Sequence, residues 1–449
     1  MVMTRINRRQ FLDGSLRGAA ALSAGLWATS RVLGANERVR VALVGCGGRG
    51  QYVIRGMIEQ GADAVCLCDL HEGRRAAAAQ FIEPVQQKAP RFETDMRRVF
   101  DADDIDAVVI ATPDHWHAPA SIAACRAGKD VYVEKPHCHN IRESRIMLDV
   151  VRQTGRVLQV GTQNRSAPYN LAALDYVRSG KLGDIRLVKV YNLKPGGPFT
   201  LGDQGEPPPG FDWDAWLGPA PDRPYHQRIF AGGWHHFWDF SGGDLCDDGI
   251  HQLDLAMMLM GDPGMPGAVV ATGGRLQHRG DDSQVPDLLV VNYDFDDFVL
   301  AFEHSNYPRY MRKTESTIRR NDELPYWTQN ATRIELYGSE LHMTVGRHGG
   351  GWQVVQSGGR VVDQMFGRPA DAPHYADFLD AVKTRRRPNA DIETLHPSGC
   401  MIHMANVAHR TGDRKLWFDA DTETFPNDDD ANALLGRTYR GKYAIPQQA

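Results

Sequence analysis

The sequence predicts an α/β fold that begins with a doubly wound parallel sheet over residues 37–160. Two observations carry this prediction. An apolar run at residues 38–44 (RVRVALV) ends directly in a glycine-rich turn that opens an amphipathic helix. Further apolar segments then alternate with helical segments as far as Val160. Such alternation specifies a parallel sheet with helices on both faces, whose ligands bind at the carboxyl ends of the strands. The further strands are expected at residues 64–68, 105–111, 130–134 and 157–160.

The glycine-rich turn has the pattern of a dinucleotide site. Gly45, Gly47 and Gly50 fill G-x-G-x-x-G, with Gly48 and Arg49 between them. The preceding strand and the following helix supply the context that a Rossmann fold requires. The first glycine permits the tight turn, the second lets backbone N–H groups approach a pyrophosphate, and the third lets the helix pack against the strand. The helix N-terminus favours the phosphate charge.

A carboxylate, Asp69, ends the second predicted strand. At this position it accepts hydrogen bonds from ribose hydroxyls and repels a 2′-phosphate, so NAD is expected as the cofactor. Arg74 and Arg75 lie nearby and keep NADP as the less favoured alternative.

Composition limits the classes of partner. The net charge of −5 provides no broad basic surface, which argues against nucleic acid. The seven cysteines form no CxxC pair, so we expect packed, reduced thiols.

Residues 1–36 resemble a twin-arginine export signal. Arg8 and Arg9 precede a weakly apolar stretch that contains Arg17 and Arg31 and is too polar for a stable membrane anchor. We therefore expect a periplasmic or otherwise exported protein; the alternative is an amphipathic N-terminal helix of a cytoplasmic enzyme. Because this route carries folded proteins, the cofactor is expected to be loaded before export and tightly bound.

Two motifs follow predicted strands and should face the cofactor. Thr112, Pro113 and His117 belong to the first, and Glu134, Lys135 and Pro136 to the second. A later D-x-x-x-H pair, Asp247 and His251, falls within a predicted helix at residues 242–261.

Together these motifs resemble the glucose–fructose oxidoreductase/inositol dehydrogenase (Gfo/Idh/MocA) family from Val39 to about Tyr443. The resemblance implies a second α/β domain at residues 161–421 with a large, open, mostly antiparallel sheet, and a homodimer or homotetramer built through it. It also implies NAD(P)-dependent oxidation of a sugar or cyclitol hydroxyl. Residues 422–449 are expected to form a tail or arm. The implied cofactor-binding residues are Gly45, Gly47, Gly48, Arg49, Gly50, Asp69, Thr112, Pro113, His117, Glu134 and Lys135.

Lys135, Asp247 and His251 are the predicted catalytic residues. Removing a hydride from an alcohol requires a base near the hydroxyl proton, and histidine has a suitable intrinsic pKa. Lys135, beside a positive nicotinamide ring, is expected to have a lowered pKa and to stabilise an alkoxide. Which of Lys135 and His251 takes the proton stays open. Asp247 holds a substrate hydroxyl or orients the imidazole, a role that Asp254 offers as well.

Substrate contacts are expected from Asp247 and His251, and from Gln163, Asn164 and Arg165, which follow the last strand of the first sheet. A long loop at residues 194–240 is rich in aromatic side chains, which either stack on sugar rings or are buried against the sheet.

Four histidines offer a rival interpretation. His115, His117, His137 and His139 lie on two loops predicted to be adjacent, a set that resembles a zinc site. Members of this family do not usually use a catalytic metal, so no metal is expected.

The favoured function is an exported oxidoreductase that acts on a hydroxyl of a sugar or glycoside, with C3 preferred from family tendency. Two alternatives stay open. One is an NAD-dependent, redox-neutral glycosidase of the same fold, although some of those relatives replace the E-K-P lysine. The other is a non-catalytic sugar-binding member.

Overall fold

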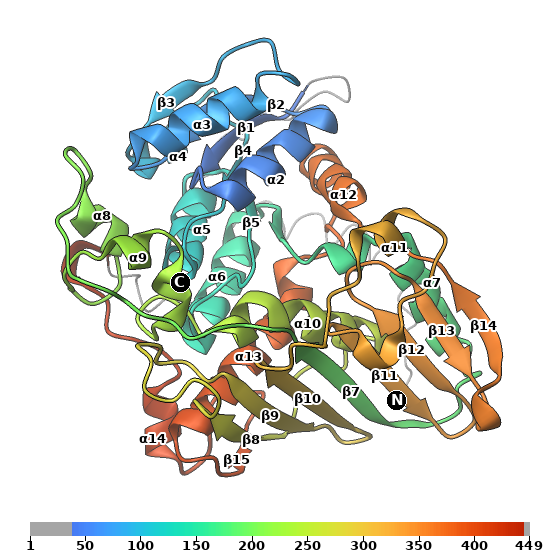
Figure 1. Ribbon diagram of the computed structural model, residues 1–449. Coiled ribbons are helices and arrows are strands. Elements are labelled where there is room, and N and C mark those ends of the chain that lie inside the picture. Colours follow the sequence, from blue (N-terminus) through green and yellow to red (C-terminus); the bar gives the residue numbers. More distant parts are fainter. Residues whose placement is uncertain (1–37, 444–449) are drawn as a thin grey trace, which may run out of the picture.

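The computed structural model describes residues 38–443, and the predicted export signal lies outside them. The chain forms two sheets with helices packed around and between them (Figure 1). Each sheet matches its prediction: the first is parallel, and the second is mixed and mostly antiparallel.

The first sheet has six strands in the order β3-β2-β1-β4-β5-β6. The strands are β3 (Arg91–Glu93), β2 (Asp63–Cys68), β1 (Arg40–Val44), β4 (Ala107–Ile110), β5 (Asp130–Val133) and β6 (Leu158–Val160). The helices are α2 (Gly48–Glu59), α3 (Glu72–Ile82), α4 (Met96–Phe100), α5 (His117–Arg126) and α6 (Ile141–Thr154). Among the strands of this sheet, only the short edge strand β3 was not predicted, because three residues carry no periodic pattern.

The second sheet has nine strands in the order β14-β13-β12-β11-β7-β10-β9-β8-β15. Only its β7–β10 pair is parallel. The strands are β14 (Val361–Met365), β13 (Trp352–Val355), β12 (His342–Gly346), β11 (Arg333–Gly338), β7 (Ile185–Leu193), β10 (Val299–Ser305), β9 (Leu288–Asp294), β8 (Ala268–Gly274) and β15 (Leu416–Trp417). The helices of this part are α7 (Pro168–Arg178), α8 (Trp213–Leu217), α9 (Gln227–Phe230), α10 (Ile250–Leu259), α11 (Ser316–Arg320), α12 (Asp371–Thr384), α13 (Ile392–Arg410) and α14 (Asp429–Ala433).

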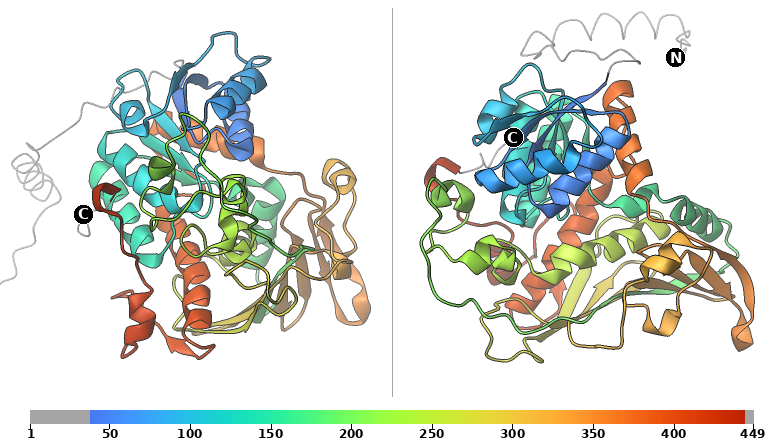
Figure 2. Two further views of the ribbon diagram at one scale, coloured as in Figure 1. Left: turned by 60° about the vertical axis from the view of Figure 1, so that its left-hand side comes forward. Right: turned by 45° about the horizontal axis from the view of Figure 1, so that its top comes forward.

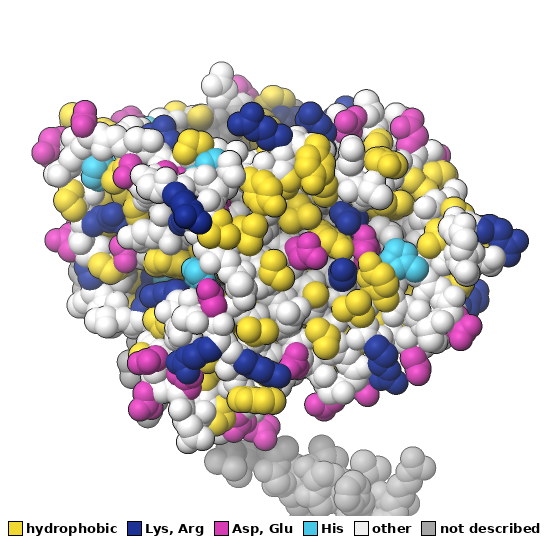
Figure 3. Space-filling view, turned by 60° about the horizontal axis from the view of Figure 1, so that its bottom comes forward, with side chains coloured by type: hydrophobic (Ala, Val, Ile, Leu, Met, Phe, Trp, Pro, Cys, Tyr) yellow, Lys and Arg dark blue, Asp and Glu magenta, His cyan; other side chains and the backbone are white. Residues whose placement is uncertain are grey.

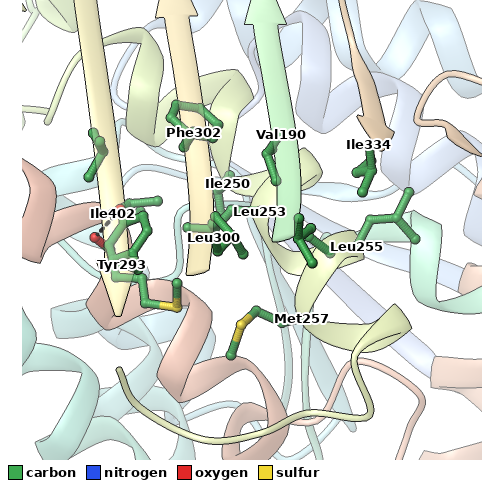
Figure 4. Packing of buried hydrophobic residues seen from close by; sticks show 14 of the residues in the cluster. Val190, Ile250, Leu253, Leu255, Met257, Tyr293, Leu300, Phe302, Ile334 and Ile402 are labelled. Atoms are coloured by element: carbon green, nitrogen blue, oxygen red, sulfur yellow. Dashed lines mark hydrogen bonds between the residues drawn. The ribbon is translucent and has the colours of Figure 1, made fainter. Parts of the chain in front are cut away.

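Helix α10 is buried between this sheet and the rest of the molecule. Its side chains Ile250 and Leu253 point toward Val190, Leu300 and the other apolar residues of the strands (Figure 4). Each fully buried aliphatic side chain of this kind contributes about 1.5–3 kcal/mol. The helix that carries His251 is therefore held firmly at one wall of the space between the domains.

The chain returns to the first sheet after leaving the second. Helix α12 lies beside α2 (Figures 1 and 2), where Tyr375 packs so closely that a Cβ on Gly56 would overlap its ring. The start of α13 joins the core on the other face of the first sheet through Ile392 and Leu395. The two domains are thus linked by shared cores as well as by the chain between β6 and α7.

The described helices include none that is long and apolar enough to cross a membrane. All seven cysteines are buried and free, as predicted.

Candidate active site between the two domains

Two cavities meet between the domains. The larger, about 750 Å³, is lined by the glycine turn, Asp69 and the loops after β4 and β5. The smaller, about 370 Å³, is lined by Gln163, Asn164, His251 and segments of the second domain. Four residues line both cavities: Arg49, Glu134, Lys135 and Asp247. A ligand in one cavity therefore meets a ligand in the other at the Lys135–Asp247 pair.

The glycine turn has the geometry that its pattern predicts. Gly45 adopts a φ of +94°, and a Cβ there would lie 2.5 Å from the carbonyl oxygen of Ala111. A Cβ on Gly50 would collide with the carbonyl oxygen of Gly45, whereas Gly47 and Gly48 face open space. The first and third glycines are thus needed by the fold, and the second leaves room for a ligand.

Asp69 ends β2 at the wall of the larger cavity. Its Oδ2 accepts a 2.8 Å hydrogen bond from the backbone N–H of Cys46, and its Oδ1 accepts one from His71. The carboxylate thus braces the glycine turn. Arg74 also lines the cavity, while Arg75 donates to the backbone carbonyl of Asp69.

The two predicted loops are tied together by His117. Its ring nitrogens lie 2.6 Å from the carbonyl oxygen of Pro136 and 2.8 Å from that of Thr112. Thr112, Pro113 and His117 all line the larger cavity. The Oγ1 atom of Thr112 is buried and has no hydrogen-bond partner among the described residues, so it is available to a ligand.

Glu134 is buried next to Lys135, the lysine predicted to be catalytic. Its Oε1 accepts a 2.8 Å hydrogen bond from Nε of Arg49, while its Oε2 has no partner among residues 38–443. A Cβ on Gly161 would lie 2.8 Å from the Oε1 atom, so the loop after β6 passes close to this carboxylate. The open glycine turn, Asp69 and the unpartnered oxygens of Thr112 and Glu134 fit a dinucleotide in the larger cavity.

Lys135 and Asp247 form the central contact of the site. The Nζ atom lies 2.5 Å from Oδ1 of Asp247. Burial works to lower the pKa of Lys135, but the carboxylates of Asp247 and Glu134 outweigh it and raise that pKa. Burial likewise works to raise the pKa of Asp247, and Lys135, His235 and Lys194 overcome this and lower it. The expected lowering of the lysine pKa is therefore not produced by the protein's own groups, which hold Lys135 as an ammonium.

Asp247 lies in a π-helical turn, Leu245–Gly249, that leads into α10. Such turns are rare and are frequent at functional sites. His251, on the first turn of α10, is buried, and its Nδ1 has no partner within the described part of the chain. Burial, with the charges of Arg347 and Lys135, lowers the pKa of His251 well below its usual range. The site thus pairs a charged lysine with a neutral histidine.

Some side chains of the loop after β6 line the smaller cavity, and another is buried in the core. Gln163 and Asn164 line the smaller cavity, and Nδ2 of Asn164 donates to the backbone carbonyl of His251. The prediction for Arg165 is wrong: its guanidinium is buried and bonded to Asp254 and Asp262. Asp254 is consequently engaged with Arg165 and Ser398 and is not the group that orients His251.

The four predicted zinc candidates have separate partners. His115 and His139 contact the backbone carbonyls of Trp216 and Trp238, and His137 contacts Ser144. Within residues 38–443, no group of three or more His, Cys, Asp or Glu side chains is placed to hold a metal ion.

The aromatic loop forms mostly a small core of its own. Its buried aromatic residues are Phe199, Trp216, Tyr225, Phe230, Phe237 and Phe240. Trp234 and His235 instead line the larger cavity near Asp247. Most of its rings are therefore buried, but in this separate core and not against the sheet as the sequence suggested.

Sequence reasoning missed several residues that line the smaller cavity: Lys194, Asp248, Lys313, Arg319, Arg347 and His348. They lie in the π-helical turn, in α11 and in loops of the second domain, far apart in the sequence. It also missed Tyr443, which reaches the rim of the larger cavity and packs edge-on against Trp116.

Comparison with known proteins agrees with this architecture. Residues 39–162 match an oxidoreductase family with an NAD-binding Rossmann fold, and residues 199–300 and 346–445 match the C-terminal α/β domain of that family. The chain is 29% identical over 227 residues to scyllo-inositol 2-dehydrogenase (NAD(+)) of Bacillus subtilis, covering 50% of this chain and 55% of the relative. It is also 29% identical over 212 residues to an alpha-N-acetylgalactosaminidase of Shewanella oneidensis, covering 41% and 45%. These matches span about half the length of the relatives.

Among solved structures, the WlbA dehydrogenase of Bordetella pertussis, in complex with NADH and UDP-GlcNAcA, superposes with a TM-score of 0.62 at 19% identity. The superposition covers 85% of this chain and 99% of that one. This likeness concerns the fold.

Proposed function

Since the chain belongs to the Gfo/Idh/MocA oxidoreductase family and carries its NAD-binding Rossmann domain, we propose that it oxidises or reduces a hydroxyl of a sugar or glycoside with bound NAD(H). The observation that carries the proposal is the Lys135–Asp247 pair, where the two cavities meet. The sugar occupies the smaller cavity. C3 of a hexopyranoside is the preferred position, on family tendency alone.

A nicotinamide in the larger cavity supplies the acceptor or donor of hydride. The chain's own residues handle the proton of the hydroxyl. His251, which lines the smaller cavity and is kept neutral by burial, is able to accept it. Lys135, kept charged by Asp247 and Glu134, donates a hydrogen bond to the oxygen as negative charge develops on it. In this proposal His251 accepts the proton and Lys135 stabilises the oxygen, two roles that the sequence left open between them.

Export is proposed from Arg8 and Arg9. NAD is a cytoplasmic resource, so an exported enzyme needs a cofactor that stays bound. Packing of the Tyr443 ring at the rim of the larger cavity supports retention. Fusing residues 1–36 to a reporter tests the export. We expect transport to be lost when Arg8 and Arg9 are both replaced by lysine, and a reporter that is transported regardless would contradict this.

A redox-neutral glycosidase is the second candidate, and the similarity to the Shewanella galactosaminidase favours it. In that chemistry, transient oxidation at C3 acidifies the C2 proton, the aglycone leaves by elimination, and water and hydride then return. The presence of Lys135 favours the dehydrogenase.

One incubation separates these functions from a sugar-binding role. Purified protein is mixed with glycosides while absorbance at 340 nm and free aglycone are followed. Reduction of the cofactor without aglycone release indicates a dehydrogenase, and release without net reduction indicates a glycosidase. A protein that binds sugar and does neither has a binding role, which would overturn the proposal. Recovery of apo-protein that needs added NAD at every turnover would overturn cofactor retention.

A second copy of the chain is the proposed partner. The outer face of the nine-stranded sheet carries hydrophobic side chains among charged ones (Figure 3). Val290, Val299 and Tyr337 are 41%, 38% and 37% exposed there, on three strands of that sheet. A homodimer or homotetramer would cover them.

A further inference from the structure

The smaller cavity carries more positive than negative charge. Seven lysine and arginine side chains line it, against four carboxylates. Three of these cations have carboxylate partners of their own: Arg49 pairs with Glu134, Lys135 with Asp247 and Arg368 with Asp322. The remaining four are Lys194, Lys313, Arg319 and Arg347.

Three of these four cations, all except Arg319, share two carboxylates, Asp248 and Asp244. Nζ of Lys313 lies 2.6 Å from Oδ2 of Asp248, Nζ of Lys194 lies 2.9 Å from the same atom, and Nη2 of Arg347 lies 3.6 Å from Oδ1. Lys194 also pairs with Asp244. Arg319 has no carboxylate within ion-pair distance in the described chain, and its Nε donates to the backbone carbonyl of Thr314. The cluster is therefore short of negative charge.

The local backbone brings these side chains together from separate loops. Lys194 follows β7, and Lys313 and Arg319 lie in the connection between β10 and β11. Arg347 precedes a turn in which Gly349, Gly350 and Gly351 all have φ between +76° and +80°. A Cβ on Gly351 would collide with the carbonyl oxygen of Met365, so the turn requires glycine there.

Burial makes the surplus charge costly. The side chains of Arg347 and Asp248 are 9% and 8% exposed. Burial lowers the pKa of Arg347, Arg319 and Lys313. Like charges in such a space repel strongly unless an anion joins them, and guanidinium groups bind carboxylate and phosphate oxygens through paired hydrogen bonds.

We propose that the substrate is an anionic sugar, whose carboxylate or phosphate binds Lys313, Arg319 and Arg347 while its reacting hydroxyl faces Lys135 and His251. This inference rests on the proposed function, because it identifies the occupant of the same cavity. The carboxylate of a sugar acid and the phosphate of a sugar phosphate share the required chemistry. The experiment distinguishes them.

The test compares D-glucuronate, glucose 6-phosphate and glucose with the full-length protein. Reduction of the bound cofactor gives kcat/KM, and titration calorimetry gives binding without turnover. We expect one of the two anions to exceed glucose by at least about 10-fold in kcat/KM, as expected for hydrogen bonds to a charged group. The anion with the higher kcat/KM shows whether the site binds a carboxylate or a phosphate.

The variant Arg319→Gln removes the cation that has no carboxylate partner, so the fold should tolerate it. We expect it to lower kcat/KM and affinity for the anionic sugar about 10-fold or more relative to its effect on glucose. Arg320→Gln is the matched control, because Arg320 is the next residue of α11, is exposed and does not line the cavity. Lys313→Gln should repeat the effect.

Two results separate this inference from the proposed function. The anionic substrate is overturned if the protein oxidises glucose as efficiently as both anions. It is also overturned if Arg319→Gln lowers kcat/KM equally for all three sugars. Either result leaves the proposed oxidoreductase activity intact. Binding of an anionic sugar that Arg319→Gln abolishes, without cofactor reduction by any sugar, supports the anion site and overturns the oxidoreductase. Equal calorimetric affinity for glucose and both anions overturns the anion site directly.

Discussion

Nζ of Lys135 donates a 2.5 Å hydrogen bond to Oδ1 of Asp247, which lies 112 positions away in the other domain. The lysine follows β5 of the first sheet, and the aspartate lies in the π-helical turn before α10. The contact therefore joins the wall of the larger cavity to the wall of the smaller cavity. It also sets the charge of the lysine, since Asp247 and Glu134 outweigh burial and raise the pKa of Lys135.

Replacing Asp247 with asparagine should remove most of this effect. Without the carboxylate, burial lowers the pKa of Lys135, so the lysine loses its charge at a lower pH. We expect kcat to fall about 10²- to 10⁴-fold, and the alkaline limb of the kcat profile to move to lower pH. Steady-state kinetics between pH 6 and pH 10 measures both.

Asp297→Asn is the control, because Asp297 is an exposed carboxylate on the second domain. Its kinetics should match those of the unmodified protein. An Asp247→Asn protein with normal kcat and an unmoved alkaline limb would show that the pair has no role in proton handling.

The parts of this site that the sequence predicts are those set by short local patterns. Gly45, Gly50 and Asp69 lie at turns or strand ends whose geometry follows from the residues around them. Arg165 could not be placed, because adjacent residues of one loop point in different directions and only the fold turns its guanidinium toward Asp254.

The cluster of lysine and arginine side chains in the smaller cavity could not be predicted from local patterns. Lys194 and Arg347 lie in loops and Arg319 in the short helix α11, and the second sheet brings these three distant segments together. The triple glycine that follows His348 is the one local signal that a backbone turn occurs there. It predicts a turn and gives no direction for the side chain of Arg347.

Alanine substitutions at the second and third glycines of the turn should have different effects on stability and on NAD binding. In Gly47→Ala the new Cβ meets open space, so the free energy of unfolding should stay within about 0.5 kcal/mol while bound NAD is lost. In Gly50→Ala the Cβ collides with the carbonyl oxygen of Gly45, so the fold and the cofactor should both be lost. Urea denaturation and the NAD content of the purified protein measure the two effects.

Gly48→Ala serves as the control for stability alone, because its Cβ also meets open space and alanine favours a helix. We expect it to be as stable as the unmodified protein. Full NAD retention in Gly47→Ala would mean that the dinucleotide does not approach this turn.

Buried histidines should make the protein sensitive to mild acid. Burial lowers the pKa of His115 to about 3 and that of His374 and His403 to about 4. In the unfolded chain each histidine takes up its proton near pH 6.5. Between about pH 6.5 and pH 4 the unfolded state therefore binds more protons, and the free energy of unfolding falls as the pH falls.

Each of these histidines should contribute roughly 1 kcal/mol per pH unit in the lower part of that window. Urea denaturation at pH 7, 6 and 5 measures the slope. His403→Gln should reduce it by about one histidine's share. A slope in His403→Gln equal to that of the unmodified protein would contradict the assignment.

The outer face of the second sheet gives the last prediction. Along β9, Leu289 and Val291 point into the core while Val290 between them points outward. If a second copy of the chain covers this face, a charge at Val290 must be buried against apolar surface, which costs several kcal/mol. We expect the double variant Val290→Lys, Val299→Lys to have the mass of one chain by light scattering, where the unmodified protein has the mass of two or four. Leu171→Lys, an exposed position on α7, should not change the assembly. A double variant that keeps the unmodified mass would place the interface elsewhere on the molecule.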